Sequence, residues 1–324
     1  MKTLKRIAAC ALLALGMLPA ASMAQVAYPA KPIRVIVPFG PGSAPDILAR
    51  MVALDLSDSV GSALVENRPS ASGILGVEYV AKSPPDGYTL LLGMTATQTI
   101  NPSLYATIPY DPLRDFTPVA MLAYAPFVVV LANDVPAKTI QELIALARKN
   151  PGKLTFASAG SGSMNGICFE LIKNRAGIDV VQVPYKGIAL GVPDVISGRV
   201  SIMCNSVAAL LPHIKSGKMR VIVTADVKRS AILPDMPTLA EEGLAGTEVA
   251  SWYAVYGPAG LPSGITETLN AQVRKMLGSA RIRERFLELG LNSSPMTPEE
   301  LAEVTRRDLQ KWAKVLKDFN IKAE

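Results

Sequence analysis

Short apolar runs alternate with helical patterns along most of this chain, and this alternation restricts the possible fold more than any other feature. Runs rich in Val, Ile and Leu are typical of buried strands, and segments with apolar residues every three to four positions follow them. Strands that alternate with helices form parallel sheets covered by helices. The predicted strands are residues 33–38, 63–66, 89–93, 119–122, 128–131, 154–158, 180–184, 200–204, 221–225 and 252–256.

The predicted helices suggest that the chain leaves its first domain and returns to it. About 300 residues is more than one hydrophobic core usually serves, so two domains are expected. The last three helices follow one another with little strand between them and must pack on an existing sheet. We therefore predict an α/β protein of two lobes with a hinged cleft between them, where a ligand would bind. Lobe 1 would comprise residues 25–124 and 245–324, and lobe 2 residues 125–244. The predicted helices are residues 46–57, 140–149, 166–175, 209–216, 265–277, 282–289 and 298–318.

The first 24 residues predict an export signal. Lys2, Lys5 and Arg6 form a basic start, residues 7–18 are apolar, and small residues at 22 and 24 fit cleavage after Ala24. Residues 1–24 therefore have the pattern of a signal peptide. Its apolar core is too short to span a membrane, and no other apolar run reaches the ~18 residues of a spanning helix. We expect an exported, soluble protein.

Charge and cysteine content exclude some partners. The formal net charge of +6 falls to +3 when the three basic residues of the signal peptide are removed. This excess is small and scattered along the chain, so nucleic acid is not an expected partner. Only Cys168 and Cys204 remain after processing. An exported compartment permits a disulfide between them, but the pattern favours two buried thiols.

A glycine-rich junction follows the first predicted strand. Ser43 and Asp46 have the spacing of a capping box, so a helix should begin at Ser43. A strand that leads through such a loop into a helix presents unpaired N–H groups and the positive end of the helix dipole to an anion. An ordinary turn that binds nothing is the alternative. The residues of this junction that we expect at a ligand site are Phe39, Gly40, Pro41, Gly42, Ser43 and Asp46.

Four further junctions place hydroxyls, amides and N–H groups after predicted strands, where ligands bind in open α/β sheets. They carry almost no charge, which suits a carboxylate held by neutral donors. A flexible linker is the alternative for residues 158–165. The residues expected to contact the ligand are Thr95, Ala96, Thr97, Ser158, Gly160, Ser161, Gly162, Ser163, Met164, Asn165, Tyr185, Asn205 and Ser206.

Catalytic motifs are largely absent from the sequence. The one histidine, His213, lies in a helical pattern, where a surface or capping role is more common than a base. No G-x-S-x-G elbow, P-loop, H-E-x-x-H or C-x-x-C motif occurs. The sequence therefore predicts no enzyme, no metal site and no cofactor, and an enzyme that uses unfamiliar residues is the alternative.

Several motifs, in order along essentially the whole mature chain, resemble one family. The chain is similar to the substrate-binding proteins of tripartite tricarboxylate transporters, also called the Bug family. The resemblance implies a periplasmic, type II-like, two-lobed binding protein that closes on a small organic carboxylate. It would pass that ligand to the large and small subunits of a membrane permease, and we expect a monomer. A sensor that docks on a membrane receptor is the alternative. The motifs are the run from Tyr28-Pro29 to Arg50, VENRP at Val65, PDGYTLL at Pro85, VPYKG at Val183, LPHI at Leu211, LPDMPT at Leu233, WY at Trp252 and PAG at Pro258.

The chain departs from the family pattern at four positions. Ser43 stands where a second glycine is usual, and its hydroxyl is expected to cap the helix. Gly166 stands in place of a common histidine, and Ile188 in place of a glycine. Asn205 and Ser206 replace a frequent Asp-Asn pair, which removes a negative charge from the expected cleft. That loss should favour a more anionic ligand, or one without an amine.

These observations combine into one hypothesis for binding. A ligand carboxylate would lie against the N–H groups near Gly42 and Ser43, while Asp46 would fix the loop, because a second carboxylate would repel the anion. Closure of the lobes would bury the ligand, with water bridging some contacts. Side chains of Phe39, Met164 and Tyr185 would shape the wall or belong to the core. The other expected donors are Thr95 and Thr97 from lobe 1, and Ser158, Ser161, Gly162, Ser163 and Asn205 from lobe 2.

Overall fold

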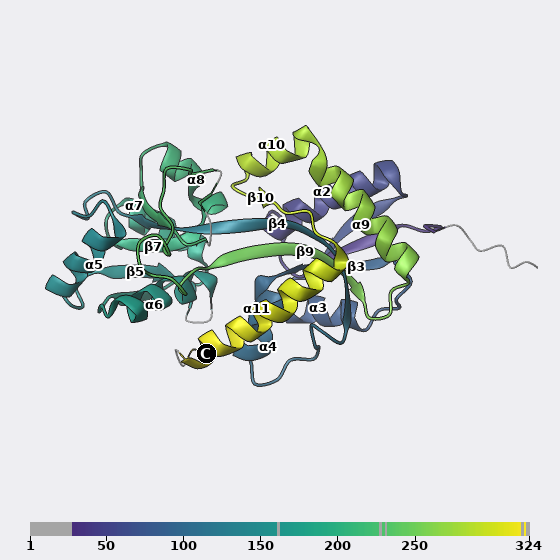
Figure 1. Cartoon of the computed structure of the whole chain (residues 1–324), viewed down its shortest axis with the longest axis horizontal. Helices are drawn as coiled ribbons and strands as arrows, with labels where there is room; N and C mark the ends of the chain where they lie inside the picture. The colour runs from purple at the N-terminus through teal and green to yellow at the C-terminus, as the bar shows by residue number, and fades with distance from the viewer. Residues whose placement is uncertain (1–27, 161–162, 227–228, 231, 319–320, 322–324) are drawn as a thin grey trace, which may run out of the picture.

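The protein is an α/β molecule of two lobes joined by long strands (Figure 1). The computed structural model describes residues 28–160, 163–226, 229–230, 232–318 and 321, so the predicted signal peptide and the predicted ligand residues Ser161 and Gly162 lie outside the described residues. In chain order the elements are β1 (Ile33–Val37), α2 (Ala44–Ser59), β2 (Ala63–Asn67), η1 (Ala71–Gly73), α3 (Ile74–Ala81), β3 (Thr89–Met94), η2 (Ala96–Ile100), α4 (Asn101–Leu104), β4 (Phe116–Leu131), α5 (Ile140–Lys149), β5 (Thr155–Ser158), α6 (Met164–Ala176), β6 (Val181–Pro184), η3 (Ile188–Gly191), α7 (Val192–Ile196), β7 (Ile202–Ser206), α8 (Val207–Lys215), β8 (Arg220–Thr224), β9 (Ala250–Pro258), α9 (Ser263–Gly278), α10 (Ala280–Glu288), β10 (Asn292–Ser293) and α11 (Pro298–Asp318).

One continuous sheet runs through both lobes in the order β2-β1-β3-β9-β4-β7-β5-β6, and β8 and β10 also pair with β4. Lobe 1 contains β1, β2, β3, β9 and β10, and lobe 2 contains β5 to β8. The prediction of parallel sheets is correct for the pairs that β1 and β5 form. It is wrong for every pair of β4 and for the pair of β3 with β9, which are antiparallel. Strand β4 carries the chain into lobe 2 and β9 carries it back, so these two strands run in opposite directions.

Strand β4 is longer than predicted because two expected strands, 119–122 and 128–131, are parts of it. Pro126 lies between these two segments, and proline donates no ladder hydrogen bond. In the structure, the pairing with β9 ends at Pro126 and the pairing with β7 begins at Phe127. The missing N–H therefore falls where β4 changes partners. As a result, a single strand of 16 residues belongs to both lobes.

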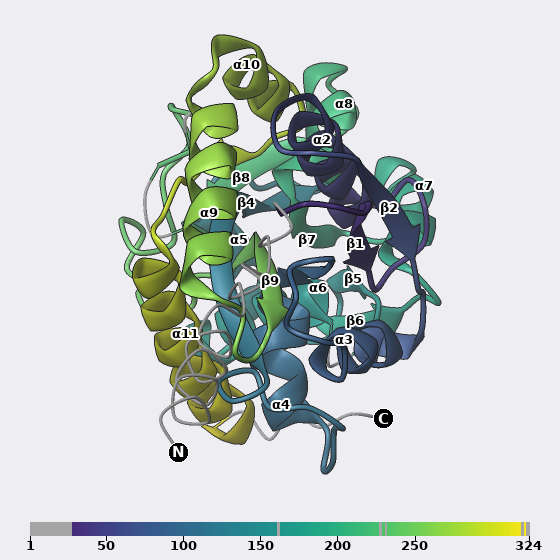
Figure 2. The ribbon, with the colours of Figure 1, turned by 90° about the vertical axis from the view of Figure 1, so that its right-hand side faces the viewer.

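Apolar side chains form a core on each face of the lobe 1 sheet and a third core in lobe 2. Figure 2 shows helices α2 and α3 on opposite sides of β1. Leu48 and Val52 of α2 and Leu269 of α9 pack on one face of lobe 1, and Val77 and Val80 of α3 pack on the other. Helices α5, α6 and α8 contribute to the core of lobe 2 with the buried residues Leu143, Ile144, Ile167, Phe169, Leu171 and Leu210.

Helix α11 packs along β4, η2 and α4. Its Leu301 and Val304 belong to a core of lobe 1, whereas Trp312 and Leu316 belong to the apolar cluster that fills lobe 2 and also includes Ile100 of η2. These positions recur at helical spacing and so lie on one face of the helix. Figure 1 shows α11 in yellow, running from below β3 towards the lobe that contains α6. The last turns of α11 therefore reach the apolar cluster that continues from η2 into lobe 2.

Two further features concern the export hypothesis. Among the described residues, no helix combines the length and the apolar character that crossing a membrane requires. Cys168 of α6 and Cys204 of β7 form a disulfide, with 6.2 Å between their Cα atoms. The prediction of two buried thiols is therefore wrong. These cysteines are 36 residues apart, and only the folded lobe brings α6 against β7.

Candidate functional site

The carboxyl ends of strands from both lobes face each other along β4. Strand β3 ends at Met94, which pairs with Tyr253 of β9, and Tyr253 pairs in turn with Ala123 of β4. Strand β7 runs the opposite way and ends at Ser206, opposite Phe127 of β4. The four residue steps from Ala123 to Phe127 span about 13 Å, taking a rise of ~3.3 Å per residue. This separation suits a small molecule held between loops of the two lobes.

The loop after β1 is held by Asp46, which is 2% exposed. Its carboxylate accepts hydrogen bonds from the Gly42 N–H (2.9 Å), from Asn67 Nδ2 (2.9 Å) and from two nitrogens of Arg50 (3.0 and 3.1 Å). Burial alone would raise the pKa of Asp46, but the hydrogen bonds from Arg50, Gly42 and Asn67 outweigh it and lower that pKa. The carboxylate is therefore ionised, paired and committed to the loop.

The hydrogen bonds of the predicted capping box at Ser43 do not form, so that prediction is wrong. Helix α2 begins at Ala44 with Ser43 at the N-cap position, but no side chain caps it. The Ser43 hydroxyl donates to the Gly40 carbonyl (2.7 Å), and Asp46 binds the Gly42 N–H. The loop turns back on itself, so its polar groups bond within it. Consequently, the Gly42 N–H is not free for a ligand, and the first turn of α2 keeps uncapped N–H groups.

The threonines after β3 anchor the turn that follows. Thr95 Oγ1 accepts from the Trp252 N–H (2.8 Å), and Thr97 Oγ1 donates to the Met94 carbonyl (3.1 Å). Both threonines are fully buried, whereas Ala96 between them is half-buried. Thr97 therefore donates to the backbone and Thr95 accepts from it, and contact of the two hydroxyls with a ligand stays a prediction.

Hydrogen bonds tie Ser158, Gly160 and Ser163 to one another and to the start of α6. The Ser158 hydroxyl donates to the Gly160 carbonyl (2.9 Å) and accepts from Gln182 Nε2 (2.9 Å). Ser163 also donates to the Gly160 carbonyl (2.6 Å), and it caps α6 by accepting from the Gly166 N–H (3.1 Å). Ser158 and Gly160 therefore lie close to the start of α6.

Glycine is required at position 166 by this close approach. A Cβ atom there would lie 2.5 Å from the Gly160 carbonyl oxygen and 2.8 Å from Ser158 Oγ. A histidine, which the family resemblance suggests at this position, would push the turn away. Gly166 therefore sets the conformation of the loop that precedes α6.

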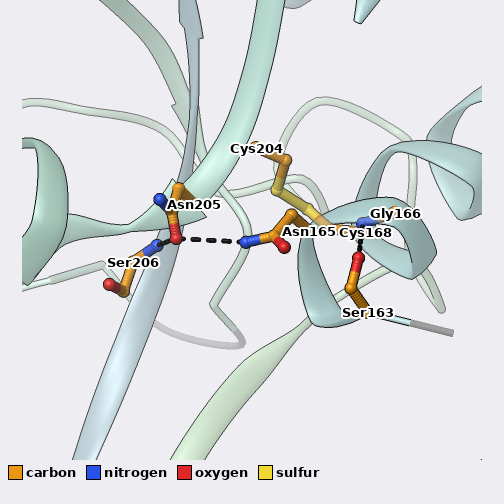
Figure 3. The surroundings of a disulfide bond; sticks show 7 residues. All are labelled: Ser163, Asn165, Gly166, Cys168, Cys204, Asn205 and Ser206. Carbon is orange, nitrogen blue, oxygen red and sulfur yellow. Dashed lines mark hydrogen bonds between the residues drawn. A yellow bond between two sulfur atoms is a disulfide. The ribbon is translucent and has the colours of Figure 1, made fainter. Parts of the chain in front are cut away.

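Two asparagines meet where β7 and α6 approach each other (Figure 3). Asn165 Nδ2 donates to Asn205 Oδ1 (3.2 Å), which also accepts the Ser206 N–H (2.8 Å). The hydroxyl of Ser206 caps α8 by accepting from the Ala209 N–H (3.4 Å). Asn165 and Asn205 are 7% and 5% exposed, so a ligand could reach them only at this edge of the lobe.

The predicted wall residues make contacts of their own. The Tyr185 hydroxyl donates to Asp194 Oδ2 (2.7 Å), and burial together with that carboxylate raises the pKa of Tyr185 to about 12. Met164 packs partly against the core of lobe 2. The ring of Phe39 lies against Gly73, where a Cβ atom would come within 3.1 Å of it. All three are half-buried and belong at least partly to the packing.

The strand ends are electropositive although they carry few charged groups. Helices α2, α6 and α8 all start there, and each contributes roughly half a positive charge at its N-terminus. Asp46, the acid of the first loop, is paired with Arg50. The only histidine, His213, is in the last turn of α8, at the end remote from Ser206. No group of three or more potential metal ligands occurs among the described residues.

Some residues that shape these loops were not predicted as site residues. Asn67 Nδ2 binds both Asp46 and the Phe39 carbonyl (3.1 Å), and Gln182 binds Ser158. Asn67 lies in the VENRP motif, so the resemblance contained a signal for it. Gln182 lies in a strand with no such signal, because only the pairing of β6 with β5 brings it to Ser158.

Comparison with known proteins identifies the family. The family model described as "Tripartite tricarboxylate transporter family receptor" matches residues 48–321. The chain is 35% identical over 305 residues to Protein BugT of Bordetella pertussis, covering 94% of each chain.

Solved structures of periplasmic proteins have the same fold. The R. palustris protein Rpa4515 with adipate is 34% identical, with a TM-score of 0.81 and coverage of 91% of this chain and 99% of that one. The periplasmic binding protein BugD (30%, TM-score 0.78, coverage 92% and 100%) and MatC of Rhodopseudomonas palustris with bound malate (30%, 0.76, 89% and 100%) are also similar. The chain therefore belongs to the tripartite tricarboxylate transporter receptor family, whose members are periplasmic solute-binding proteins.

Proposed function

We propose that this chain is exported to the periplasm, captures a small organic dicarboxylate between its lobes and delivers it to a tripartite tricarboxylate-type permease. It acts as a binding protein and not as an enzyme. The lobes, divided near residues 125 and 245, close on the ligand by bending β4 and β9. Similar proteins solved with adipate and with malate support this ligand class.

One observation carries the proposal: the N-termini of α2, α6 and α8 lie at strand ends that face each other across ~13 Å of β4. The side-chain hydroxyls there mostly bond to the protein itself. Backbone N–H groups and the amides of Asn165 and Asn205 are then the groups left to hold a ligand. Such donors favour an anion with several acceptor oxygens.

Thermal melting with a panel of acids tests the ligand class. Adipate, malate and succinate should raise the melting temperature, because a ligand at 100 times its Kd stabilises the folded state by about 2.7 kcal/mol. Glucose and the diamine cadaverine serve as neutral and cationic controls. A shift with glucose and none with any acid would refute the proposal.

Asn205→Asp supplies a sharper test of charge. The new carboxylate would lie beside Asn165, where the proposal places the anion. We expect a loss of at least tenfold in acid affinity at pH 7, and a smaller loss for Asn205→Ala. Asp58→Asn, on the exposed side of α2, is the control that changes the charge by one unit away from the strand ends and should leave affinity unchanged.

The transport partner needs a separate experiment. Loaded and empty protein would be compared for binding to the purified large and small permease subunits in membranes. Preferential binding of the loaded form supports delivery. Binding to a membrane receptor in place of the permease would assign the protein to sensing.

A further inference from the structure

The Cys168–Cys204 disulfide lies next to the Asn165–Asn205 pair at the strand ends of lobe 2. Cys204 immediately precedes Asn205 on β7, and Cys168 follows Asn165 by three residues on α6. Residues three apart on a helix lie on the same side of it. Figure 3 shows both asparagines beside the Cys168–Cys204 bridge.

The geometry of the pair determines which groups it can offer. Asn205 Oδ1 accepts two hydrogen bonds, from Asn165 Nδ2 and from the Ser206 N–H. The Nδ2 group of Asn205 is consequently turned away from Asn165 and is a donor. Figure 3 shows that nitrogen on the side of Asn205 opposite Asn165. An anion at the strand ends would accept a hydrogen bond from it.

The hydrogen bond between the asparagines is long and joins two neutral amides, so it fixes their relative position only weakly. Strand β7 and helix α6 belong to different segments of the chain, 36 residues apart at the cysteines. Both cysteines are fully buried, so the covalent link lies in the core, below the exposed edge. A bridge at this place restrains α6 against β7 one residue from Asn205 and one helical turn from Asn165.

We propose that the Cys168–Cys204 disulfide is a positioning element of the ligand site, which holds the Asn165–Asn205 pair in the geometry that binds the anion. This inference rests on the function proposed above. Binding groups lose effectiveness when they are displaced by as little as 1 Å. The bridge should therefore affect ligand affinity as well as stability.

Isothermal titration with adipate, malate and succinate at a temperature where all proteins are folded tests this role. Cys168→Ala/Cys204→Ala should weaken binding of the best acid at least fivefold. Leu143→Ala is the matched control, because it removes a fully buried side chain of α5 in the same core, at the far end of lobe 2. It should lower the melting temperature without changing Kd. Cys168→Ala/Cys204→Val, which refills part of the volume, replaces the double alanine variant if that variant does not fold.

A double-mutant cycle distinguishes an effect of the disulfide on the position of the two asparagines from a general loosening of lobe 2. In an Asn165→Ala/Asn205→Ala background the cysteine substitutions should change Kd by less than twofold, because the pair they position is gone. Equal fivefold losses with and without the asparagines would overturn the inference, as would unchanged affinity in the cysteine variants. Absence of acid binding by the wild-type protein would instead refute the proposed function.

Discussion

Asp46 shows how a residue can be essential to a ligand site without touching ligand. Its carboxylate joins the Gly42 N–H, Asn67 and Arg50, and so fixes the loop between β1 and α2. In this way the loop gains rigidity while the negative charge is neutralised by a neighbouring cation. The uncapped first turn of α2 then faces the other lobe without an unpaired acid beside it.

Asp46→Ala should lower the free energy of unfolding by about 2 kcal/mol, because it removes several hydrogen bonds to a buried carboxylate. The pKa of Asp46 is lowered in the folded state, so its contribution is present above the unfolded pKa of about 3.9 and is lost as pH falls through the folded value. Asp46→Asn should therefore flatten the loss of stability below about pH 4. Urea unfolding at several pH values measures both effects.

Asp58→Asn is the control for that series, since Asp58 is an exposed acid of the same helix. It should change stability by less than 0.5 kcal/mol at neutral pH, the usual range for such a surface substitution. Equal pH profiles for wild type and Asp46→Asn would contradict the account of the loop.

Gly166→Ala is expected to destabilise the protein by about 2 kcal/mol, because the new methyl group would collide with the backbone oxygen of Gly160. It should also weaken acid binding by moving the loop before α6. Chemical unfolding and titration measure the two effects. Gly264→Ala in α9 has open space around its Cβ position and should be nearly neutral. Full affinity in Gly166→Ala would show that this loop takes no part in binding.

At the scale of elements, periodicity was a good guide where a helix covers a sheet. The predicted bounds of α5 and α11 match the structure, because amphipathic spacing continues to both ends of each helix. Sequence patterns did not reveal α3, the short helix α4 or the two-residue strand β10. Helix α3 is short and apolar apart from Glu78 and Tyr79, so it lacks a clear helical period.

The strand ends were predicted, but the bonding of their side chains was not. Thr97, Ser158 and Ser163 stand where ligand contacts were expected, yet each bonds to its own loop. A short polar side chain after a strand can serve the backbone or a ligand, and the sequence pattern is the same in both cases. Only the folded loop distinguishes them.

Loss of the disulfide should be visible in stability, independently of ligand. A bridge that closes a loop of 36 residues is worth about 4 kcal/mol in the chain-entropy model. Cys168→Ala/Cys204→Ala should therefore unfold at a clearly lower urea concentration than wild type. Under strong reductant the bridge of the wild-type protein should be reduced once the chain unfolds, and its urea midpoint should then approach that of the variant. An unchanged midpoint in the double alanine variant would mean that the bridge does not form in the protein as expressed.

At the scale of the whole molecule, the two tryptophans lie at the connection between the lobes. Trp252 is near the start of β9, and its Nε1 donates to Asp308 of α11 (2.9 Å). Trp312 of α11 is buried in the core of lobe 2. Movement of the lobes would change the surroundings of both residues.

Intrinsic fluorescence should therefore respond when an acid of the panel binds. Trp252→Phe and Trp312→Phe would each retain part of the change, since the chain has no other tryptophan. Small-angle scattering on the same samples should show a smaller radius of gyration with ligand. A fluorescence change without compaction would place the effect at α11 alone. If ligand changed neither the fluorescence nor the radius of gyration, that result would argue against closure.

The sharing of β4 and α11 between the lobes has a consequence for heat denaturation. Strand β4 supplies ladder bonds to both parts of the sheet, and α11 adds side chains to a core of lobe 1 and to the apolar cluster that joins η2 with lobe 2. Neither half can melt without exposing apolar surface of the other. Calorimetry should consequently record one cooperative peak whose van't Hoff and calorimetric enthalpies agree, where two loosely tethered halves would give two peaks.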